Sequence, residues 1–271
     1  MIEQPAHNRR FGRSPSGLRA AQVLKHLFSA LLFGLLCAGC ASVSQPDYPL
    51  VPTVSPDAHR IFHNGTILTM NPGQPAAKAI SIAGDKIEAV GSDDDVLALR
   101  RPNSVVVDLQ GRTLMPGFVD PHTHLFNDAE QYLDMTVTEV QQVALENGIT
   151  TIGDMYVTED FLREMQEMER AGQLQIRTSL YLVMTDPCGE LQGDWWQQHP
   201  PTRVQGEQLR IGGVKIFTDG GTCERPALSY ELEPGGGLGD LFHTQEELNE
   251  LVAQAHAAGF QVAIHAIGDR A

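Results

Sequence analysis

From about residue 113 onward the sequence alternates between short apolar stretches and stretches of helical periodicity, and this alternation limits the fold more than any other feature. Helical spacing appears at residues 136–146, 159–171 and 244–258, and Thr244 with Glu247 forms a capping box at the start of the last of these. Strands that alternate with helices predict parallel βα units. The runs typical of buried strands are residues 113–121, 149–155, 176–184, 211–217 and 260–265.

Five strands of this kind predict an α/β fold, a (β/α)8 TIM-like barrel that is incomplete in this sequence. A closed barrel of parallel strands needs eight, and Ala271 follows the fifth strand too closely to supply the other three units. A fragment of a longer protein and a naturally truncated chain are both open explanations, and we expect a fragment. In either case one edge of the sheet is expected to be open.

Residues 58–112 have a different pattern, in which short alternating runs are separated by turn signals. The turns are Asn64-Gly65, Asn71-Pro72-Gly73 and Gly84-Asp85. Together they predict a small antiparallel β unit, which we expect to form a small N-terminal β-sandwich at the side of the barrel. The predicted boundaries are therefore 58–112 for the β-sandwich part and 113–271 for the first five βα units.

The first 40 residues differ in composition from the remainder and predict an export signal. Five basic residues precede an apolar stretch at residues 27–36, which is too short for a permanent membrane span. The segment Leu36-Cys-Ala-Gly-Cys40 resembles the bacterial lipoprotein box, which implies lipidation of Cys40; a plain secretory signal is the alternative. Residues 41–57 are expected to form a flexible tether. We therefore expect an exported lipoprotein, anchored to a membrane of the cell envelope, in the outer membrane or periplasm of a Gram-negative cell.

Charge and cysteine content narrow the choice of partners. Without residues 1–40 the chain has 14 Lys and Arg against 33 Asp and Glu, a formal net charge of −19. This charge argues against nucleic acid as a partner. Beyond residue 40 the cysteines are Cys188 and Cys223, and either a bridge between them or a free Cys223 thiol near the site is open. Formation of a homo-oligomer is open as well.

A His-x-His pair, His122 and His124, follows the apolar run that ends in Asp120-Pro121. Alternate side chains of a β-strand share a face, so both imidazoles can bind one metal ion. The pair is predicted at the carboxyl end of a short buried strand, which is where α/β barrels place their chemistry. Two loop or core histidines without a ligand are the alternative.

Three separated motifs between about residues 58 and 271 lie in the order found in a known family. They are residues 111–124, Gly-Arg-Thr-Leu-Met-Pro-Gly-Phe-Val-Asp-Pro-His-Thr-His; residues 214–220, Val-Lys-Ile-Phe-Thr-Asp-Gly; and residues 262–270, Val-Ala-Ile-His-Ala-Ile-Gly-Asp-Arg. With these motifs the chain resembles the amidohydrolase superfamily, and within it the amidohydrolase 3 group of metal-dependent hydrolases.

The resemblance implies a metal centre made of His122, His124, Lys215 and His265, which binds one or two divalent ions, with zinc expected first. Lys215 has the place of a lysine that is often carboxylated in the family and then bridges two ions. The alternatives are a lysine whose charge reaches solvent, and a buried structural histidine at His265. The sixth-strand histidine and the eighth-strand aspartate of the family, the latter its general base, have no counterpart in this sequence.

Other polar residues of the motifs have expected roles around this centre. Asp154 and Asp219 follow or end predicted strands and are expected to bind loop amides or to orient a metal ligand. Arg225 and Arg270 are candidates for binding a substrate carboxylate, with a structural ion pair as the alternative for each.

The predicted function is hydrolysis of a carbon–nitrogen bond other than a peptide bond, in an amide or cyclic amide of a small-molecule substrate. A second hypothesis is deamination or the opening of an imidazolone-like ring, because residues 117–124 also resemble imidazolonepropionases. A third is a membrane-tethered protein without turnover, and the incomplete barrel is its support.

Overall fold

The computed structural model describes residues 58–202 and 208–271. The predicted export signal, the tether and Cys40 lie outside these residues. Within the described part of the chain, no helix combines the length and the apolar character needed to cross a membrane.

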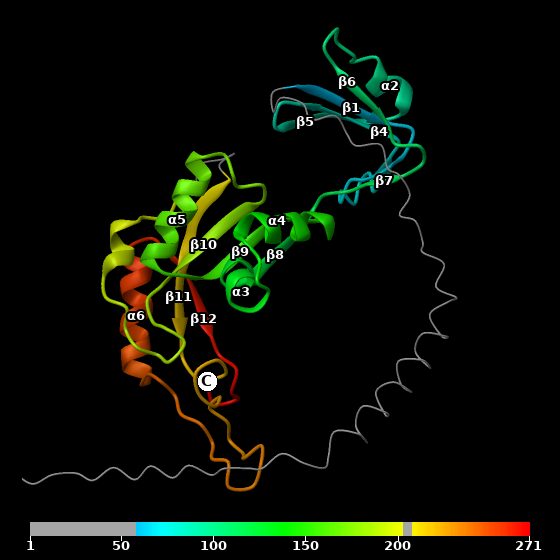
Figure 1. The fold of residues 1–271 in the computed structure, drawn as a ribbon. Helices are drawn as coiled ribbons and strands as arrows, with labels where there is room; N and C mark the ends of the chain where they lie inside the picture. The colour runs from blue at the N-terminus through cyan, green and yellow to red at the C-terminus, as the bar shows by residue number, and fades with distance from the viewer. Residues whose placement is uncertain (1–57, 203–207) are drawn as a thin grey trace, which may run out of the picture. The chain divides into compact units, whose positions relative to one another are not determined.

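Five strands of the second half of the chain form one curved parallel sheet, a half-barrel. They are β8 (Phe118–Thr123), β9 (Ile149–Val157), β10 (Arg177–Val183), β11 (Leu209–Phe217) and β12 (Gln261–His265). Their order in the sheet is β12-β11-β10-β9-β8, so each strand pairs in parallel with the next one along the chain. Figure 1 shows them side by side, coloured from green to red. The predicted α/β class and the five predicted strands are confirmed.

Helices alternate with these strands along the chain and connect them. They are α3 (Leu125–Tyr132), α4 (Val137–Glu146), α5 (Glu159–Arg170) and α6 (Gln245–Ala257), with a short 3-10 turn at Trp195–Gln198. The capping box predicted from Thr244 and Glu247 opens α6, and a second one formed by Thr136 and Glu139 opens α4. The three predicted helices are confirmed, whereas α3 was not predicted.

The core of the half-barrel lies between the sheet and its helices. Helix α5 buries Leu162, Met165 and Met168, which recur every three residues on one face. These side chains belong to one cluster with the fully buried Leu180 and Leu182 of β10. Figure 1 shows α5 and α6 along the same side of β10 and β11. The packing fixes the register of the strands, and the register decides which side chains meet at the strand ends.

Strand β8 is the exception to this burial. Its Phe118 and Val119 are 55% and 62% exposed, so the prediction of a buried histidine strand is wrong. The physical reason is its position, because β8 forms one edge of the sheet and has a single strand partner among the described residues. The apolar run at residues 113–121 is also not one strand: Phe118 onward belongs to this edge strand, whereas Thr113 and Leu114 form a separate short strand that pairs with residues 66–67.

Residues 59–114 form two small sheets. Their elements are β1 (His59–His63), β2 (Thr66–Leu68), β3 (Ala76–Ala77), β4 (Ala79–Ala83), β5 (Lys86–Gly91), α2 (Asp93–Leu97), β6 (Val105–Asp108) and β7 (Thr113–Leu114). One sheet has the order β5-β4-β1-β6 and the other β3-β2-β7. Ile67, Ile80 and Leu109 form a core cluster with residues of both sheets. The predicted β-sandwich stays a prediction.

The strand directions differ from the prediction of an antiparallel unit. β1 pairs with β6 in parallel, and β2 pairs with β7 in parallel, so both sheets are mixed. The turn signals that separate neighbouring runs identify antiparallel hairpins such as β4–β5. Parallel partners are joined by long connections that leave no such local signal, which is why they were missed.

Candidate metal centre

The strand order brings the predicted metal ligands to one edge of the half-barrel. His122 lies near the carboxyl end of β8, Lys215 near that of β11, and His265 ends β12. Because all five strands are parallel, their carboxyl ends meet at the same edge of the sheet. In the register of β11 and β12, Lys215 is paired with Ala263 and Phe217 with His265.

The His-x-His pair is built by an irregular strand end. The pairing of β8 with β9 shifts between Asp120 and Thr123, and His124 is already the residue that precedes α3. The Asp120 carboxylate accepts a hydrogen bond of 3.1 Å from the amide of His122. The two imidazole rings lie edge-on with their centroids 5.8 Å apart. The bulge and the start of α3, rather than plain strand alternation, thus set the aim of the two rings.

Lys215 lies among these rings. Its Nζ is 3.4 Å from Nε2 of His122 and 5.0 Å from the centre of the Phe217 ring. The Phe217 ring also contacts that of His265, with the two centroids 5.0 Å apart. The structure thus brings His122 and Lys215 into contact, with the His124 ring beside that of His122 and the His265 ring beside that of Phe217. Among the described residues, no three His, Cys, Asp or Glu side chains lie close enough to hold a metal ion by themselves.

Burial and positive charge keep the two imidazoles neutral. Burial lowers the pKa of His122 and of His124, and the charge of Lys215 lowers both pKa values further. A neutral imidazole has a free lone pair, which is the form that binds a metal ion. Both rings are therefore ready to act as ligands near neutral pH.

Lys215 is buried without a compensating charge. Its side chain is 1% exposed, and within the described part of the chain no carboxylate lies within ion-pair distance of its Nζ. Burial lowers its pKa to about 8. About a tenth of the amine is therefore neutral at pH 7, far more than for an ordinary lysine, and the neutral amine is the form that reacts with carbon dioxide to give a carbamate.

The donor set fits a divalent cation once Lys215 has lost its proton. His124 Nδ1 is buried and has no hydrogen-bond partner, which is an unusual state for a buried polar atom. Two neutral imidazoles and a carbamate oxygen are ligands that zinc accepts, whereas an ammonium at this place would repel it. The residues present therefore agree with the expected metal, provided that Lys215 is carboxylated or neutral.

The two aspartates have different surroundings. Asp219 is fully buried, and its carboxylate accepts hydrogen bonds from the amides of Ala227, Ile267 and Gly268 at 2.7–3.0 Å. Its Oδ1 is also 3.7 Å from Nε2 of His265. Asp219 thus ties the loops after β11 and β12 together and approaches the His265 ring.

Asp154 on β9 keeps one carboxylate oxygen without a partner. Oδ1 accepts a 3.1 Å hydrogen bond from the amide of Tyr156, while Oδ2 is buried and unpaired. Burial raises the pKa of Asp154 to about 7. Asp154 therefore supports the backbone of the last residues of β9.

A cavity of about 460 Å³ opens beside His124, and the sequence did not reveal it. It is lined by His124, Asn127, Asp128, Gln131, Tyr132, Tyr156, Pro187, Phe217 and Thr222. The Tyr156 ring stands edge-on to His124 at 6.4 Å and to Phe217 at 6.3 Å. The signal that could have found it is positional, since the lining residues lie at the carboxyl ends of β9 and β11 or in the connections that follow β8, β10 and β11.

The arginines expected to bind a substrate carboxylate lie elsewhere. Arg225 and Arg270 are exposed, and neither is among the residues that line the cavity at His124. Arg270 donates a hydrogen bond of 3.3 Å to the carbonyl of Gly239. Their proposed contact with a substrate remains a prediction.

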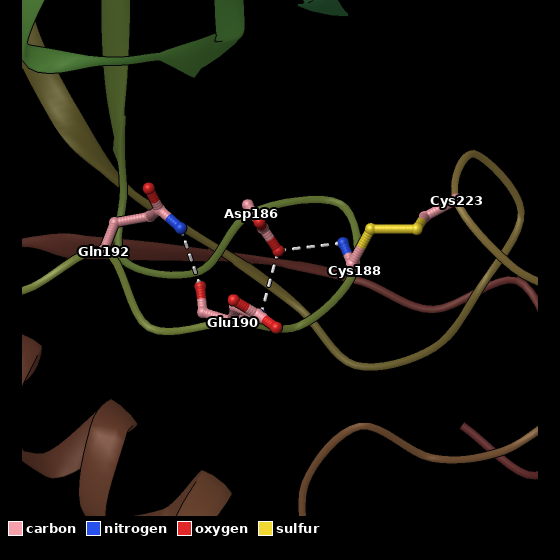
Figure 2. Close-up of a disulfide and its surroundings, with 5 residues drawn as sticks. All are labelled: Asp186, Cys188, Glu190, Gln192 and Cys223. Carbon is pink, nitrogen blue, oxygen red and sulfur yellow. Dashed lines mark hydrogen bonds between the residues drawn. A yellow bond between two sulfur atoms is a disulfide. The ribbon is translucent and has the colours of Figure 1, made fainter. Parts of the chain in front are cut away.

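A disulfide joins the loops that follow β10 and β11. Cys188 is bonded to Cys223, with a Cα–Cα distance of 5.3 Å, so the bridge exists and Cys223 is not a free thiol. Figure 2 shows the Asp186 carboxylate beside it, which accepts hydrogen bonds from the amides of Cys188 and Glu190 at 2.9 Å. Hydrogen bonds to Asp186 thus stabilise the loop after β10, and the disulfide links this loop covalently to the loop after β11.

Removing the disulfide with Cys188→Ser and Cys223→Ser together is expected to destabilise the fold by roughly 3–4 kcal/mol, because a covalent link across 35 residues restricts the unfolded chain. Urea unfolding with and without a reducing agent measures this change. The reducing agent should lower the midpoint of the wild type to that of the double variant and leave the double variant unchanged. Equal midpoints for the oxidised wild type and the double variant would contradict the expectation.

The stability of the metal-free protein is expected to rise between about pH 8 and 10.5 through Lys215. Its pKa is about 8 in the folded chain and 10.5 as the ordinary value, so in this range the unfolded chain binds the proton that the folded chain has lost. The gain is up to about 3 kcal/mol. The free energy of unfolding in urea is measured across this pH range for the chelator-treated wild type and for Lys215→Met. The difference between the two pH profiles gives the contribution of Lys215, because the variant lacks the amine. Parallel pH profiles for the two proteins would show that Lys215 titrates normally.

Comparisons with known proteins agree with this arrangement. A family model described as "Amidohydrolase family" matches residues 105–145 and 127–271. An N-substituted formamide deformylase of Arthrobacter pascens is 34% identical over 62 residues, which are 23% of this chain and 11% of that protein. An imidazolonepropionase of Desulfotalea psychrophila is 34% identical over 110 residues, which are 34% of this chain and 27% of that protein. The chain thus spans less than a third of either relative.

The fold has a counterpart among solved structures. An uncharacterized metal-dependent hydrolase from Pyrococcus furiosus superposes with a TM-score of 0.65 at 19% identity, over 79% of this chain and 68% of that one. At this identity the likeness shows the fold, which agrees with an incomplete barrel of the same type.

Proposed function

Because the chain belongs to the amidohydrolase family, we propose that it acts as a metal-dependent hydrolase of a carbon–nitrogen bond other than a peptide bond, in an amide or a cyclic amide. The observation that carries this proposal is the buried Lys215, which lies 3.4 Å from His122 with no carboxylate partner among the described residues. The names of the two curated relatives, a deformylase of substituted formamides and an imidazolonepropionase, support carbon–nitrogen bonds as the target.

His122, His124, Lys215 and His265 would hold one or two divalent ions, and we propose zinc. A bound ion of this kind lowers the pKa of a water ligand toward neutrality and polarises a carbonyl group. Lys215 would contribute as a carbamate: its neutral amine nitrogen bonds to the carbon of carbon dioxide, and one proton is released. The product carries a negative charge on two oxygens and can bridge two ions.

The residues around the centre would prepare the substrate. Burial and the nearby Asp186 charge raise the pKa of Tyr156, so its phenol stays protonated and can donate a hydrogen bond. The rings of Tyr156 and Phe217 line the cavity next to His124 and limit the access of water there. These side chains would orient a carbonyl-bearing group against the metal ligands.

Ring opening is the second candidate. It is favoured by the 34% identity to an imidazolonepropionase over 110 residues of this chain. If the protein turns over an imidazolone and not an N-substituted formamide, ring opening is its function rather than amide hydrolysis.

Zinc binding tests the proposed centre. The purified chain is loaded with zinc, desalted and analysed by plasma mass spectrometry, and one or two bound ions per chain are expected. His122→Ala and Lys215→Met are expected to lose most of this metal, because each removes one of the proposed ligands. His256→Ala is the matched control, since His256 is exposed on α6 and away from the centre.

Two further readouts complete the test. In carbon-13-labelled bicarbonate, a carbamate signal is expected from the wild type and not from Lys215→Met. If the wild type retains no zinc, manganese or iron, and its melting temperature does not change in chelator, the proposed centre is wrong.

We also propose that the protein is exported and anchored to the membrane through a lipid on Cys40. The disulfide between Cys188 and Cys223 supports an oxidising compartment, because such bonds are rare in the cytosol. The lipoprotein-box segment Leu36-Cys-Ala-Gly-Cys40 supports the anchor.

Cys40→Ser is expected to abolish metabolic labelling with palmitate and to release the protein from the membrane fraction. Cys37→Ser is the matched control within the same segment and should remain labelled and membrane-bound. Labelling of Cys40→Ser at the level of the wild type would exclude Cys40 as the lipidated residue.

A further inference from the structure

We propose that the cavity beside His124 binds an aromatic group with a positive charge, and that Asp128 is the residue that selects this charge. The proposal rests on the proposed function, because it assigns the cavity to the substrate of the adjacent centre. It goes beyond that function by naming the chemical class of the group that is bound.

Two walls and a floor define the cavity. One wall is α3, with Asn127, Asp128, Gln131 and Tyr132. The floor is made of Tyr156 and Phe217, whose rings contact each other edge-on at 6.3 Å. The facing wall is made of Pro187 and Thr222. A volume of about 460 Å³ is in the range of small-molecule sites and accommodates a single aromatic ring with a short substituent.

Asp128 is the acidic residue of this lining. It is half-buried, and among the described residues its carboxylate has no hydrogen bond or ion pair with another side chain. A second carboxylate, that of Asp186, is near enough to raise the pKa of Tyr156. Asp186 is already bonded to the amides of Cys188 and Glu190, whereas Asp128 is available to a ligand.

No cation of the described lining offsets this charge. Neither Lys nor Arg is among the lining residues, and Arg225 and Arg270 are absent from them. The amine of Lys215 is 1% exposed, lies at the Phe217 ring and is not among the lining residues. A ligand carboxylate would therefore be repelled, while a ligand cation would gain a charged hydrogen bond to Asp128.

The aromatic floor favours the same ligand. Tyr156 is half-buried and offers ring surface to a planar group, with the buried Phe217 ring beside it, and a cation near an aromatic ring is attracted by its electron density. Asn127 donates its side-chain amide to the carbonyl of Tyr156 at 2.8 Å, which links the α3 wall to the floor. The Asp128 carboxylate on α3 and the Tyr156 ring are thus available to the same ligand.

The facing wall is held in place by the disulfide. Pro187 precedes Cys188, and Thr222 precedes Cys223, so both lining residues are direct neighbours of the bridge. Figure 2 shows the two loops joined at this point. A wall with a covalent support is already formed before the ligand enters, which lowers the entropic cost of binding.

Three ligands of nearly equal shape and different charge test the proposal on the full chain: benzamidine is a cation, benzamide is neutral and benzoate is an anion. Titration calorimetry, with saturation-transfer NMR for weak binding, is expected to give benzamidine at least ten-fold tighter binding than benzamide, and benzoate the weakest binding. The series is measured in chelator, so that benzoate cannot bind through a metal ion.

Asp128→Asn is expected to weaken benzamidine to the level of benzamide and to leave benzamide unchanged, because the amide keeps the shape and removes the charge. Asp134→Asn is the matched control: Asp134 is exposed just beyond α3, has a φ of 52° that asparagine tolerates, and does not line the cavity. It should retain the full preference for benzamidine.

The proposal is overturned if the wild type binds benzoate as well as benzamidine, or if Asp128→Asn keeps the preference. The wild-type series decides this even if the variant does not fold. Failure of the proposed function has a different signature, which is a chain that prefers benzamidine but binds no metal. Metal binding without any preference among the three ligands would leave the hydrolase intact and reject the role of Asp128.

Discussion

The candidate site depends on the burial of Lys215 without a counter-ion. A lysine side chain that is 1% exposed and lies between imidazoles and the Phe217 ring is held in a place that disfavours its charge. The fold could avoid this cost with an acidic partner, and within the described residues it does not. Loss of the proton removes the cost of burying the ammonium charge, and the neutral amine can then be carboxylated to an anionic carbamate ligand. Burial lowers the pKa of His122 and of His124, and the charge of Lys215 lowers both further as long as its amine is protonated.

The parallel register of the half-barrel makes this arrangement possible. β11 is an inner strand with partners on both sides, and the helix α5 covers the sheet with the Leu162, Met165 and Met168 side chains. A lysine on such an inner strand is covered by side chains of the two adjacent strands, and its burial does not depend on an ion pair. The edge strand β8 has no such cover, and its histidines depend instead on the bulge at Pro121 and the start of α3 for their orientation.

The sequence predicted those parts of the molecule whose signals are local. The alternation of apolar runs and helices after residue 113 predicted the five parallel strands and three helices, and the residue types at the strand ends predicted which side chains would meet. The exposure of Phe118 and Val119 was not predicted, because it depends on which strands lie next to β8. The parallel pairing of β1 with β6 was missed for a similar reason, since no turn joins these strands. The cavity beside His124 was not predicted either, because Asp128 of α3, Tyr156 of β9 and Thr222 of the loop after β11 are far apart in the sequence and only the folded chain brings them together.

The bridge between Cys188 and Cys223 has a consequence for the ions that this edge of the sheet can attract. Thiolates are soft ligands with high affinity for copper and zinc, and two of them on the loops after β10 and β11 would be additional ligands for an incoming metal. In the oxidised chain both sulfur atoms are bound to each other, so neither is a thiolate. Metal selection at this edge is then left to nitrogen and oxygen donors, and protein produced in a reducing cytoplasm would offer a different choice of ligands.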